Sequence, residues 1–400
     1  MEYKTQYEYY RGKDFLSTHA DFKSIEDLKK HENERKEIFT NKLFLLPAIF
    51  KNADLIEFGP DCGENSLVFG YWGAKCRLIE PNIKTHSIIK EYFDKFSLKN
   101  NLVSIEEVDV KDFSENADKL LKKRYDFVDA EGFIYTIKPN DIWINLFSRT
   151  LKQDGFVLID YYEKFGAYIE LSQKVIHSRI KSILGVSSLE AAERVFRVKW
   201  NSMPHRRKME VWVKDVLESP FVRLKYFLDA QKLCKEMHKA GFQLYSSWPN
   251  YKDSLNIHWL KKQMSKEENL NRALETISRS RVGYLFGRKH FFIKETDQLE
   301  KELYLLIESN DKLIDNFDET EAKKCISALE KIKKVVNSQY LLSDEDGSKE
   351  TLNIIESIQN IMRLLIEGKA DEIIKFCSSD EAFIKNWGMP LHFAVFQKRI

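Results

Sequence analysis

Short apolar runs alternate along the chain with longer stretches in which apolar residues recur at helical spacing. The runs contain many β-branched and aromatic residues and cover residues 55–56, 76–79, 102–108, 125–128, 156–159 and 242–246. The helical stretches between them include residues 65–73, 84–96, 141–151 and 227–240. Strands that alternate with helices in this way are typical of a parallel sheet covered by helices. The pattern therefore predicts an α/β fold with a mostly parallel, twisted sheet.

The pattern changes after residue 296, where glycine becomes sparse and apolar residues keep helical spacing up to about residue 383. This predicts a helical C-terminal module. Residues 388–398 have the pattern of a strand that pairs back with the main sheet, and residues 290–294 are the alternative for that place. In the first case the helices are an insertion before the last strand, and in the second they are an appended domain.

We expect three parts in the chain. Residues 1–52 form an N-terminal helical extension or lid, residues 53–295 form the main α/β domain, and residues 296–400 form the helical module. Residues 164–235 are longer than a connection in a minimal fold and predict an inserted recognition segment. The candidate lid residues are Tyr7, Tyr9, Tyr10 and Arg11, and the alternative for each of them is simple packing on the sheet edge.

Composition excludes several classes of protein. The 400 residues carry a net charge of +2, which gives no overall attraction to nucleic acid or to a membrane surface. The first residues have no apolar core, so we expect no signal peptide, and no apolar run approaches the roughly 20 residues of a membrane span. The five cysteines are scattered without a CxxC pair. We therefore expect reduced thiols, no metal site and a cytoplasmic location.

The chemistry is concentrated in the turn after the first apolar run. The spacing there is Glu57-x-Gly59-x-Asp61-x-Gly63, and the second apolar run ends at Glu80. Glycine lets the backbone turn sharply and approach a ligand, and the following helix points free N–H groups at that ligand. A carboxylate at residue 80 can accept both hydroxyls of a ribose. The unit therefore predicts a nucleoside site, although the G-x-G-x-x-G fingerprint of dinucleotide sites is missing.

The same residues resemble motif I of the class I S-adenosylmethionine-dependent methyltransferases, acid-x-Gly-x-Gly-x-Gly. The resemblance implies a Rossmann-like fold over about residues 50–250 and S-adenosylmethionine as cofactor. By position, Glu57 and Gly59 would lie beside its methionine part, Gly63 would open the helix and Glu80 would bind the ribose. Asp61 stands where the family has its middle glycine. The alternative is an ordinary α/β turn without a ligand.

Further candidate residues follow the next two strands. In the family an acid after the third strand contacts the adenine amino group, and here Asp109 matches that position, with Val110 beside the ring. The alternative is that Asp109 only caps the next helix. Asp129 and Glu131 follow the fourth strand, where an acceptor would meet the methyl group. The Asn/Asp-Pro-Pro-aromatic tetrad of the nucleobase amino-methyltransferases is missing there, which argues against base methylation.

A second group of candidates lies farther along the chain. Tyr161, Tyr162 and Glu163 follow the fifth strand and are expected to bind substrate, with packing as the alternative for the two tyrosines. The inserted segment contains the basic run of His205, Arg206 and Arg207, in which arginine would bind a phosphate or carboxylate. Such a run is also typical of a solvated face. Glu131 and His205 are the candidate general bases.

The resemblance implies methyl transfer to an oxygen or nitrogen of a small polar acceptor, such as a sugar or a phosphorylated metabolite. Two other classes stay open. One is a catalytically silent protein that binds S-adenosylmethionine and acts as a scaffold, and the other is a nicotinamide-dependent oxidoreductase. We expect no nucleic acid or membrane partner, and the C-terminal helices are a candidate surface for homo-oligomers.

Overall fold

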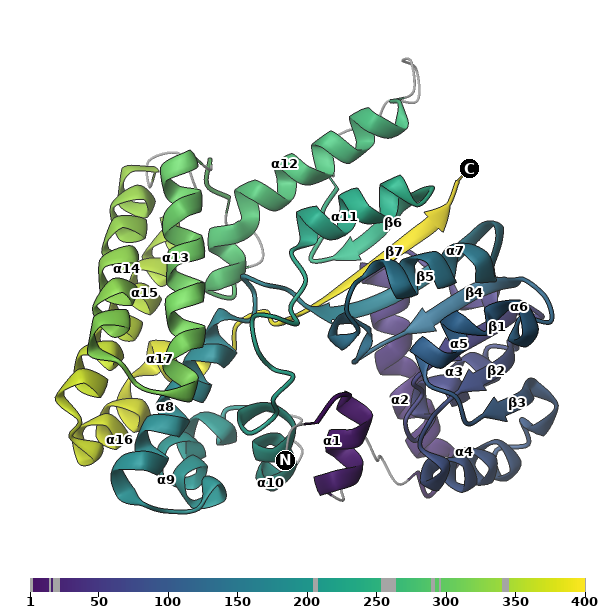
Figure 1. Cartoon of the computed structure of the whole chain (residues 1–400), viewed down its shortest axis with the longest axis horizontal. Helices are drawn as coiled ribbons and strands as arrows, with labels where there is room; N and C mark the ends of the chain where they lie inside the picture. Colours follow the sequence, from purple (N-terminus) through teal and green to yellow (C-terminus); the bar gives the residue numbers. More distant parts are fainter. Residues whose placement is uncertain are drawn as a thin grey trace. The chain divides into compact units, whose positions relative to one another are not determined.

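The structure is a computed structural model of the whole chain (Figure 1). It describes residues 3–13, 16, 22–203, 208–252, 264–288, 292–294, 296–339 and 345–399. The chain forms two compact units, each assembled from separate segments. The first comprises Met1–Tyr161, Gln231–Leu274 and His392–Ile400, and the second comprises Tyr162–Ala230 and Glu275–Leu391.

The first unit contains a seven-stranded sheet with the order β3-β2-β1-β4-β5-β7-β6. The parallel strands are β1 (Asp54–Phe58), β2 (Lys75–Ile79), β3 (Leu102–Glu106), β4 (Tyr125–Ala130) and β5 (Leu151–Tyr162). At the far edge, β6 (Phe242–Trp248) pairs antiparallel with β7 (Leu391–Lys398). The predicted α/β class with a mostly parallel sheet is confirmed, and the last strand of the chain returns to this sheet.

The helices of the first unit connect and cover the strands (Figure 1). They are α1 (Gln6–Lys13), α2 (Ile25–Glu37), α3 (Glu64–Tyr71), α4 (Ile83–Lys95), α5 (Val110–Glu115), α6 (Ala117–Leu120), α7 (Asp141–Thr150) and α11 (Ala230–Lys239). The N-terminal α2 is part of the core of this unit, since Glu32 accepts a hydrogen bond of 2.8 Å from the indole of Trp72. Phe39, just after α2, packs edge-on against Phe50 and Phe69.

The sequence pattern also predicts a helix over residues 35–50 and a turn over residues 152–155, and both of these local predictions were wrong. The helix ends early, because Phe44 has a φ of +56° and the chain continues as a short 3₁₀ helix over Pro47–Phe50. The expected turn over residues 152–155 lies within β5. The pairing with β4 jumps there from Tyr125–Leu151 to Phe127–Phe156, so the intervening residues form an irregularity inside the strand.

The second unit is helical. It contains α8 (Tyr168–Leu184), α9 (Ser188–Asn201), α10 (Met209–Trp212), α13 (Asp297–Asp315), α14 (Glu319–Gln339), α15 (Glu345–Glu367), α16 (Ala370–Ser379) and α17 (Glu381–Lys385), while α12 (Lys266–Leu285) runs from the first unit into it. Helix α8 packs on α13, and α9 packs on α16. The inserted segment and the C-terminal helices therefore share one unit, and these helices precede the last strand as an insertion.

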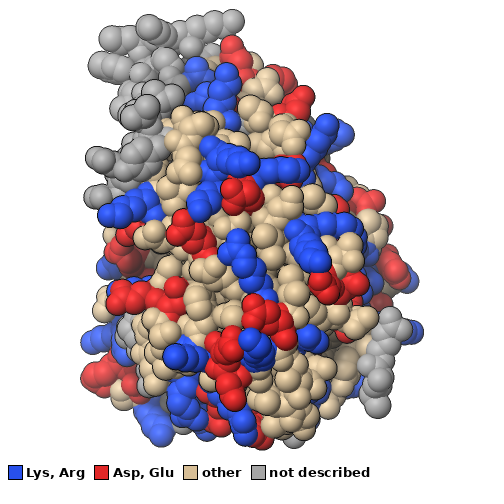
Figure 2. Space-filling view, turned by 90° about the vertical axis from the view of Figure 1, so that its left-hand side faces the viewer, with Lys and Arg blue, Asp and Glu red and all other residues tan. Residues whose placement is uncertain are grey.

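The surface of the helical unit carries both signs of charge. Figure 2 shows lysine and arginine interspersed with aspartate and glutamate over this face. Among the described residues, no helix is both long and apolar enough to cross a membrane. Of residues 290–294, the described part, 292–294, is not a strand.

Candidate functional site

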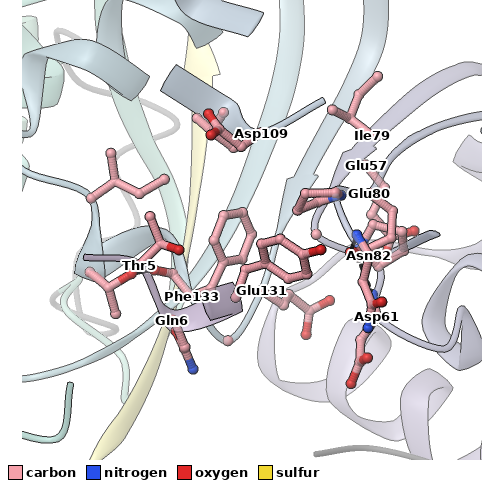
Figure 3. Close-up of a pocket in the computed structure, with 18 of the residues that line it drawn as sticks. Thr5, Gln6, Glu57, Asp61, Ile79, Glu80, Asn82, Asp109, Glu131 and Phe133 are labelled. Atoms are coloured by element: carbon pink, nitrogen blue, oxygen red, sulfur yellow. Dashed lines mark hydrogen bonds between the residues drawn. The ribbon is translucent and has the colours of Figure 1, made fainter. Parts of the chain in front are cut away.

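A cavity of about 290 Å³ lies within the first unit at the carboxyl ends of β1, β2, β4 and β5. Ligands of open parallel sheets bind at this edge. Figure 3 shows Glu80 and Asp61 on one side of the cavity, Thr5 and Gln6 on the other, and Phe133 between them. The cavity is therefore enclosed by the loops after the strands and by the segment around α1.

The loop after β1 has an unusual backbone. Gly59, Asp61 and Gly63 have φ values of +66°, +50° and +81°, so every second residue of the motif is left-handed. A Cβ on Gly59 would lie 2.6 Å from the ring of Phe133, so only glycine fits there. Aspartate is one of the few other residues that adopt the left-handed conformation readily. Asp61 therefore keeps the loop geometry that a glycine would have at this position.

Glu80 is hydrogen-bonded to the same loop. Its carboxylate is buried, lines the cavity, and accepts backbone N–H groups of Asp61 at 2.9 Å and of Asn82 at 2.7 Å. Each carboxylate oxygen thus uses one acceptor site and keeps another. Burial raises the pKa of Glu80 to about 8. A buried carboxylate with one open acceptor site on each oxygen fits a vicinal diol such as a ribose.

The residues at the ends of β1 and β4 form a buried acidic group. Glu57 lines the cavity and accepts a hydrogen bond of 2.5 Å from Ser66, and burial raises its pKa to about 8. Asp129 is fully buried beneath the cavity wall, where burial and the neighbouring charges of Glu131 and Glu57 raise its pKa well above the ordinary value. Asp129 was expected among the cofactor residues, but it is not among the described residues that line the cavity.

Both interpretations of Asp109 find a counterpart in the structure. Asp109 is the N-cap of α5 and accepts the backbone N–H of Asp112 at 2.9 Å. Asp109 also lines the cavity (Figure 3), and so does Val110. The capping bond occupies one oxygen of Asp109, so the other oxygen is available to a ligand.

Glu131 is held by a residue that the sequence analysis did not select. Arg35 of α2 forms two hydrogen bonds to the Glu131 carboxylate, at 2.8 and 2.5 Å, and both side chains are almost buried. The guanidinium also lies 4.8 Å from the centre of the Phe39 ring. Nothing in the charged sequence of α2 distinguishes Arg35 from its neighbours. Glu131 therefore lines the cavity as one half of an ion pair whose two hydrogen bonds fix its position.

Asp160 is a second residue that was missed. It follows the apolar part of β5, lines the cavity and is 7% exposed. Its Oδ1 accepts the backbone N–H of Gly132. Burial, and then the charge of Glu131, raise the pKa of Asp160 to about 7. Its position directly after the apolar run of residues 156–159 was the signal that could have selected it.

Three predicted substrate residues have other surroundings. The hydroxyl of Tyr161 lies 2.7 Å from that of Tyr251, and the ring of Tyr162 stacks on Phe227 at 5.1 Å. Glu163 is buried in the helical unit and accepts the backbone N–H groups of Phe165 and Gly166, both at 2.7 Å. None of the three is among the described residues that line the cavity. Core packing of the two tyrosines and local backbone hydrogen bonds of Glu163 therefore explain these residues without a substrate.

The basic run of the inserted segment, His205, Arg206 and Arg207, lies outside the described residues. The inserted segment also contains His177, which the structure describes. This histidine is buried, and its Nε2 lies 2.9 Å from the carbonyl oxygen of Ser188. Among the lid candidates, Tyr7 and Tyr10 line the cavity. Tyr9 is buried instead, and Arg11 lies over the Tyr7 ring.

The parallel sheet, the left-handed loop and the acidic strand end together define a Rossmann-like enzyme that binds a nucleoside-containing cofactor. The family described as "Methyltransferase domain" matches residues 30–247, more than half of the 400 residues. The chain therefore belongs to this methyltransferase family, and the class I S-adenosylmethionine-dependent type is confirmed. S-adenosylmethionine is its cofactor. No curated protein matches the chain significantly.

Several solved structures are similar in fold. The CcbJ methyltransferase from Streptomyces caelestis is 16% identical with a TM-score of 0.26, and the match covers 30% of this chain and 49% of that one. PKMT2 from Rickettsia typhi in complex with AdoHcy is 12% identical with a TM-score of 0.37, covering 60% and 47%. YjhP from E. coli is 10% identical with a TM-score of 0.36, covering 97% of both chains. The chain thus spans about half the length of the first two proteins.

Proposed function

We propose that the cavity binds S-adenosylmethionine and a small polar acceptor, and that the protein transfers the methyl group to an oxygen or nitrogen of that acceptor. The observation that carries this proposal is Glu80, a buried carboxylate that faces the cavity beside the left-handed loop of Gly59, Asp61 and Gly63. A cavity of about 290 Å³ favours a small acceptor over a polymer.

We assign the residues that line the cavity to a cofactor side and an acceptor side. The ribose would be held by Glu80, the methionine part by Glu57 and the backbone at Gly59, and the adenine by Asp109 and Val110. When bound, the cofactor supplies an electrophilic methyl carbon on a sulfonium. The acceptor would lie toward Glu131, where the N-terminal segment covers the cavity.

The chain's own contribution is alignment and exclusion of water, since the leaving group is already a good one. The side chains of Tyr7 and Tyr10 cover the cavity from α1, which supports the proposed lid role of the N-terminal segment. The ion pair with Arg35 fixes the orientation of Glu131. A phosphorylated acceptor is disfavoured, because acids outnumber bases in the described lining.

The test is a calorimetric titration with S-adenosylhomocysteine, with NAD as the control ligand. We expect S-adenosylhomocysteine alone to bind, and Glu80→Ala to weaken it by about 1–3 kcal/mol, the range for losing hydrogen bonds to a charged group. Glu91→Gln, a change at an exposed acid of α4, is the matched control and should leave the affinity unchanged. Binding of NAD instead, or unchanged affinity in Glu80→Ala, would contradict the proposal.

A further inference from the structure

The acceptor side of the cavity carries one carboxylate whose charge is not balanced. The pair of Arg35 and Glu131 is neutral as a unit, because both hydrogen bonds of the ion pair are formed. Lys111 is the single basic residue among the described lining residues, and it is exposed. Asp160 lines the same cavity without a cation bonded to it in the described part of the chain.

The geometry of Asp160 leaves one oxygen available. Oδ1 accepts the backbone N–H of Gly132, and Oδ2 has no hydrogen-bond partner among the described residues. The side chain is more than nine-tenths buried and faces the cavity. Because Asp160 lines the cavity, a ligand there that carries a hydrogen-bond donor can bind this oxygen.

A second observation also supports a cationic ligand in this cavity. The ring of Phe133 and the side chains of Tyr7 and Tyr10 line the same cavity. Acidic groups that lie beside aromatic rings attract an ammonium cation through both its charge and the ring quadrupole.

We propose that the methyl acceptor is an amine, which is bound as an ammonium group at Asp160 in the cavity that the aromatic side chains of Tyr7, Tyr10 and Phe133 also line. This inference rests on the proposed function and names the substrate class of the same site. Asp160 has two roles in it: it binds the ammonium by a charge-assisted hydrogen bond and it takes the proton that the nitrogen must lose.

The proton balance fits this role. The ammonium first gives one proton to Asp160, which frees the nitrogen lone pair. That lone pair forms the bond to the methyl carbon, while the carbon–sulfur bond breaks and leaves its electron pair on sulfur. Because burial raises the pKa of Asp160 to about 7, its carboxylate takes up a proton near neutral pH more readily than an exposed aspartate does. The charges that face Asp160 are those of Glu131 and Arg35.

The test uses three probes of the same shape: benzylamine, benzyl alcohol and benzoate. They are titrated at pH 7 into the full-length protein in the presence of saturating S-adenosylhomocysteine. We expect benzylamine to bind at least about tenfold more tightly than benzyl alcohol, and benzoate not to bind. In Asp160→Asn the preference should disappear, since asparagine keeps an oxygen for the N–H of Gly132 but has no charge. Glu91→Gln is the control and should keep the preference.

The outcomes separate this inference from the proposed function. If S-adenosylhomocysteine binds but the three probes bind equally, or none binds, or benzoate is preferred, the amine assignment is overturned and methyl transfer stands. If benzylamine is preferred but the preference survives in Asp160→Asn, the assignment to Asp160 is overturned. If S-adenosylhomocysteine itself fails to bind, the proposed function fails, whatever the probes do.

Discussion

Arg35 and Glu131 form an ion pair with two parallel hydrogen bonds, Nη1–Oε2 at 2.8 Å and Nη2–Oε1 at 2.5 Å. The two residues are 96 positions apart, one on the N-terminal helix α2 and one on the loop after β4. Their exposed fractions are 7% and 11%, so the pair is removed from water. Helix α2 therefore holds Glu131, a residue of the cavity wall, in a fixed position.

Breaking this pair should destabilise the protein strongly. In Arg35→Met, Glu131 loses its partner while Asp129 and Glu57 lose the nearest positive charge, and removing one half of a buried pair costs about 3–5 kcal/mol. The double variant Arg35→Met/Glu131→Met should cost less, because no unpaired charge is left. Urea unfolding measures both. If the double variant were less stable than Arg35→Met, this account of the pair would be contradicted.

The matched control for that experiment is an exposed pair of the same unit. Arg149 contacts Asp118, with side-chain exposures of 42% and 96%. Exposed pairs contribute about 0–1 kcal/mol, so Arg149→Met should change the free energy of unfolding by no more than that. A similar loss in Arg149→Met and Arg35→Met would show that burial is not what makes the Arg35 pair important.

Cofactor affinity should depend on pH through Glu80. The ionised carboxylate is the form that accepts two ribose hydroxyls, and burial raises its pKa to about 8 from the ordinary 4.5. Below pH 8, binding must therefore release a proton, so the Kd for S-adenosylhomocysteine should fall by up to about tenfold per unit between pH 6 and 8 and then level off. Titration calorimetry at five pH values measures this, and Glu80→Gln should remove most of the slope. If the Kd of Glu80→Gln kept its full dependence on pH, the proton released on binding would come from Glu57 instead.

The middle position of the loop offers a direct test of backbone geometry. Asp61 has a φ of +50°, which glycine adopts freely and β-branched residues adopt with about 1–3 kcal/mol of strain. Asp61→Gly should therefore keep or improve S-adenosylhomocysteine affinity, also because the Asp61 charge that raises the pKa of Glu80 is gone. Asp61→Val should weaken binding. Loss of binding in the glycine variant would mean that the Asp61 side chain, rather than its backbone, serves the site.

The part of the site that lies at strand ends could be predicted from the sequence. Glu57, Glu80 and Asp109 each follow an apolar run, and parallel strands bring such positions to one edge. Arg35 could not be predicted, because it meets Glu131 only through the packing of α2 within the first unit. Tyr161 was selected as a substrate residue but contacts Tyr251 instead. Its position after an apolar run does not reveal whether the side chain faces the cavity or the core.

The fold was predictable for the same reason. The apolar runs mark the positions of β1 to β6, and the return of the chain as β7 was one of two alternatives in the pattern. The grouping of α8 and α9 with the C-terminal helices depends on contacts such as that between Lys199 and the carbonyl oxygen of Phe383, 184 residues later. Periodicity within a window of the sequence carries no information about such distant contacts.

That lysine gives the helical unit a pH-dependent stability. Lys199 is fully buried, donates to the carbonyl oxygens of Phe383 and Asn386, and burial lowers its pKa to about 7 from 10.5. Between these two values the unfolded chain binds more protons, so this contribution to stability is present above pH 10.5 and is lost as the pH falls through about 7. Lys199→Met should cost about 1–3 kcal/mol at pH 9 through its lost hydrogen bonds, and less at pH 6.

Tryptophan fluorescence during urea unfolding at pH 6 and pH 9 measures this difference, because Trp200, Trp212 and Trp387 form an aromatic cluster in the same unit. Lys385→Met is the control, since Lys385 is an exposed lysine paired with Glu381 on α17. It should show no pH difference. A cost for Lys199→Met that is larger at pH 6 than at pH 9 would mean that the charged form is stabilised in the fold.

The contact between Gly59 and Phe133 yields the sharpest steric prediction. Gly59→Ala introduces both the strain of a left-handed alanine at φ +66° and a Cβ that lies 2.6 Å from the Phe133 ring. Gly185→Ala has the same strain at φ +63° with open space around it, so its change in the free energy of unfolding measures the strain without the collision. We expect Gly59→Ala to lose at least about tenfold in S-adenosylhomocysteine affinity and Gly185→Ala to lose none. Adding Phe133→Leu to Gly59→Ala should restore part of that affinity, because the smaller side chain makes room for the Cβ. Failure of this rescue, with both variants folded by circular dichroism, would show that backbone strain rather than the ring makes glycine necessary at position 59.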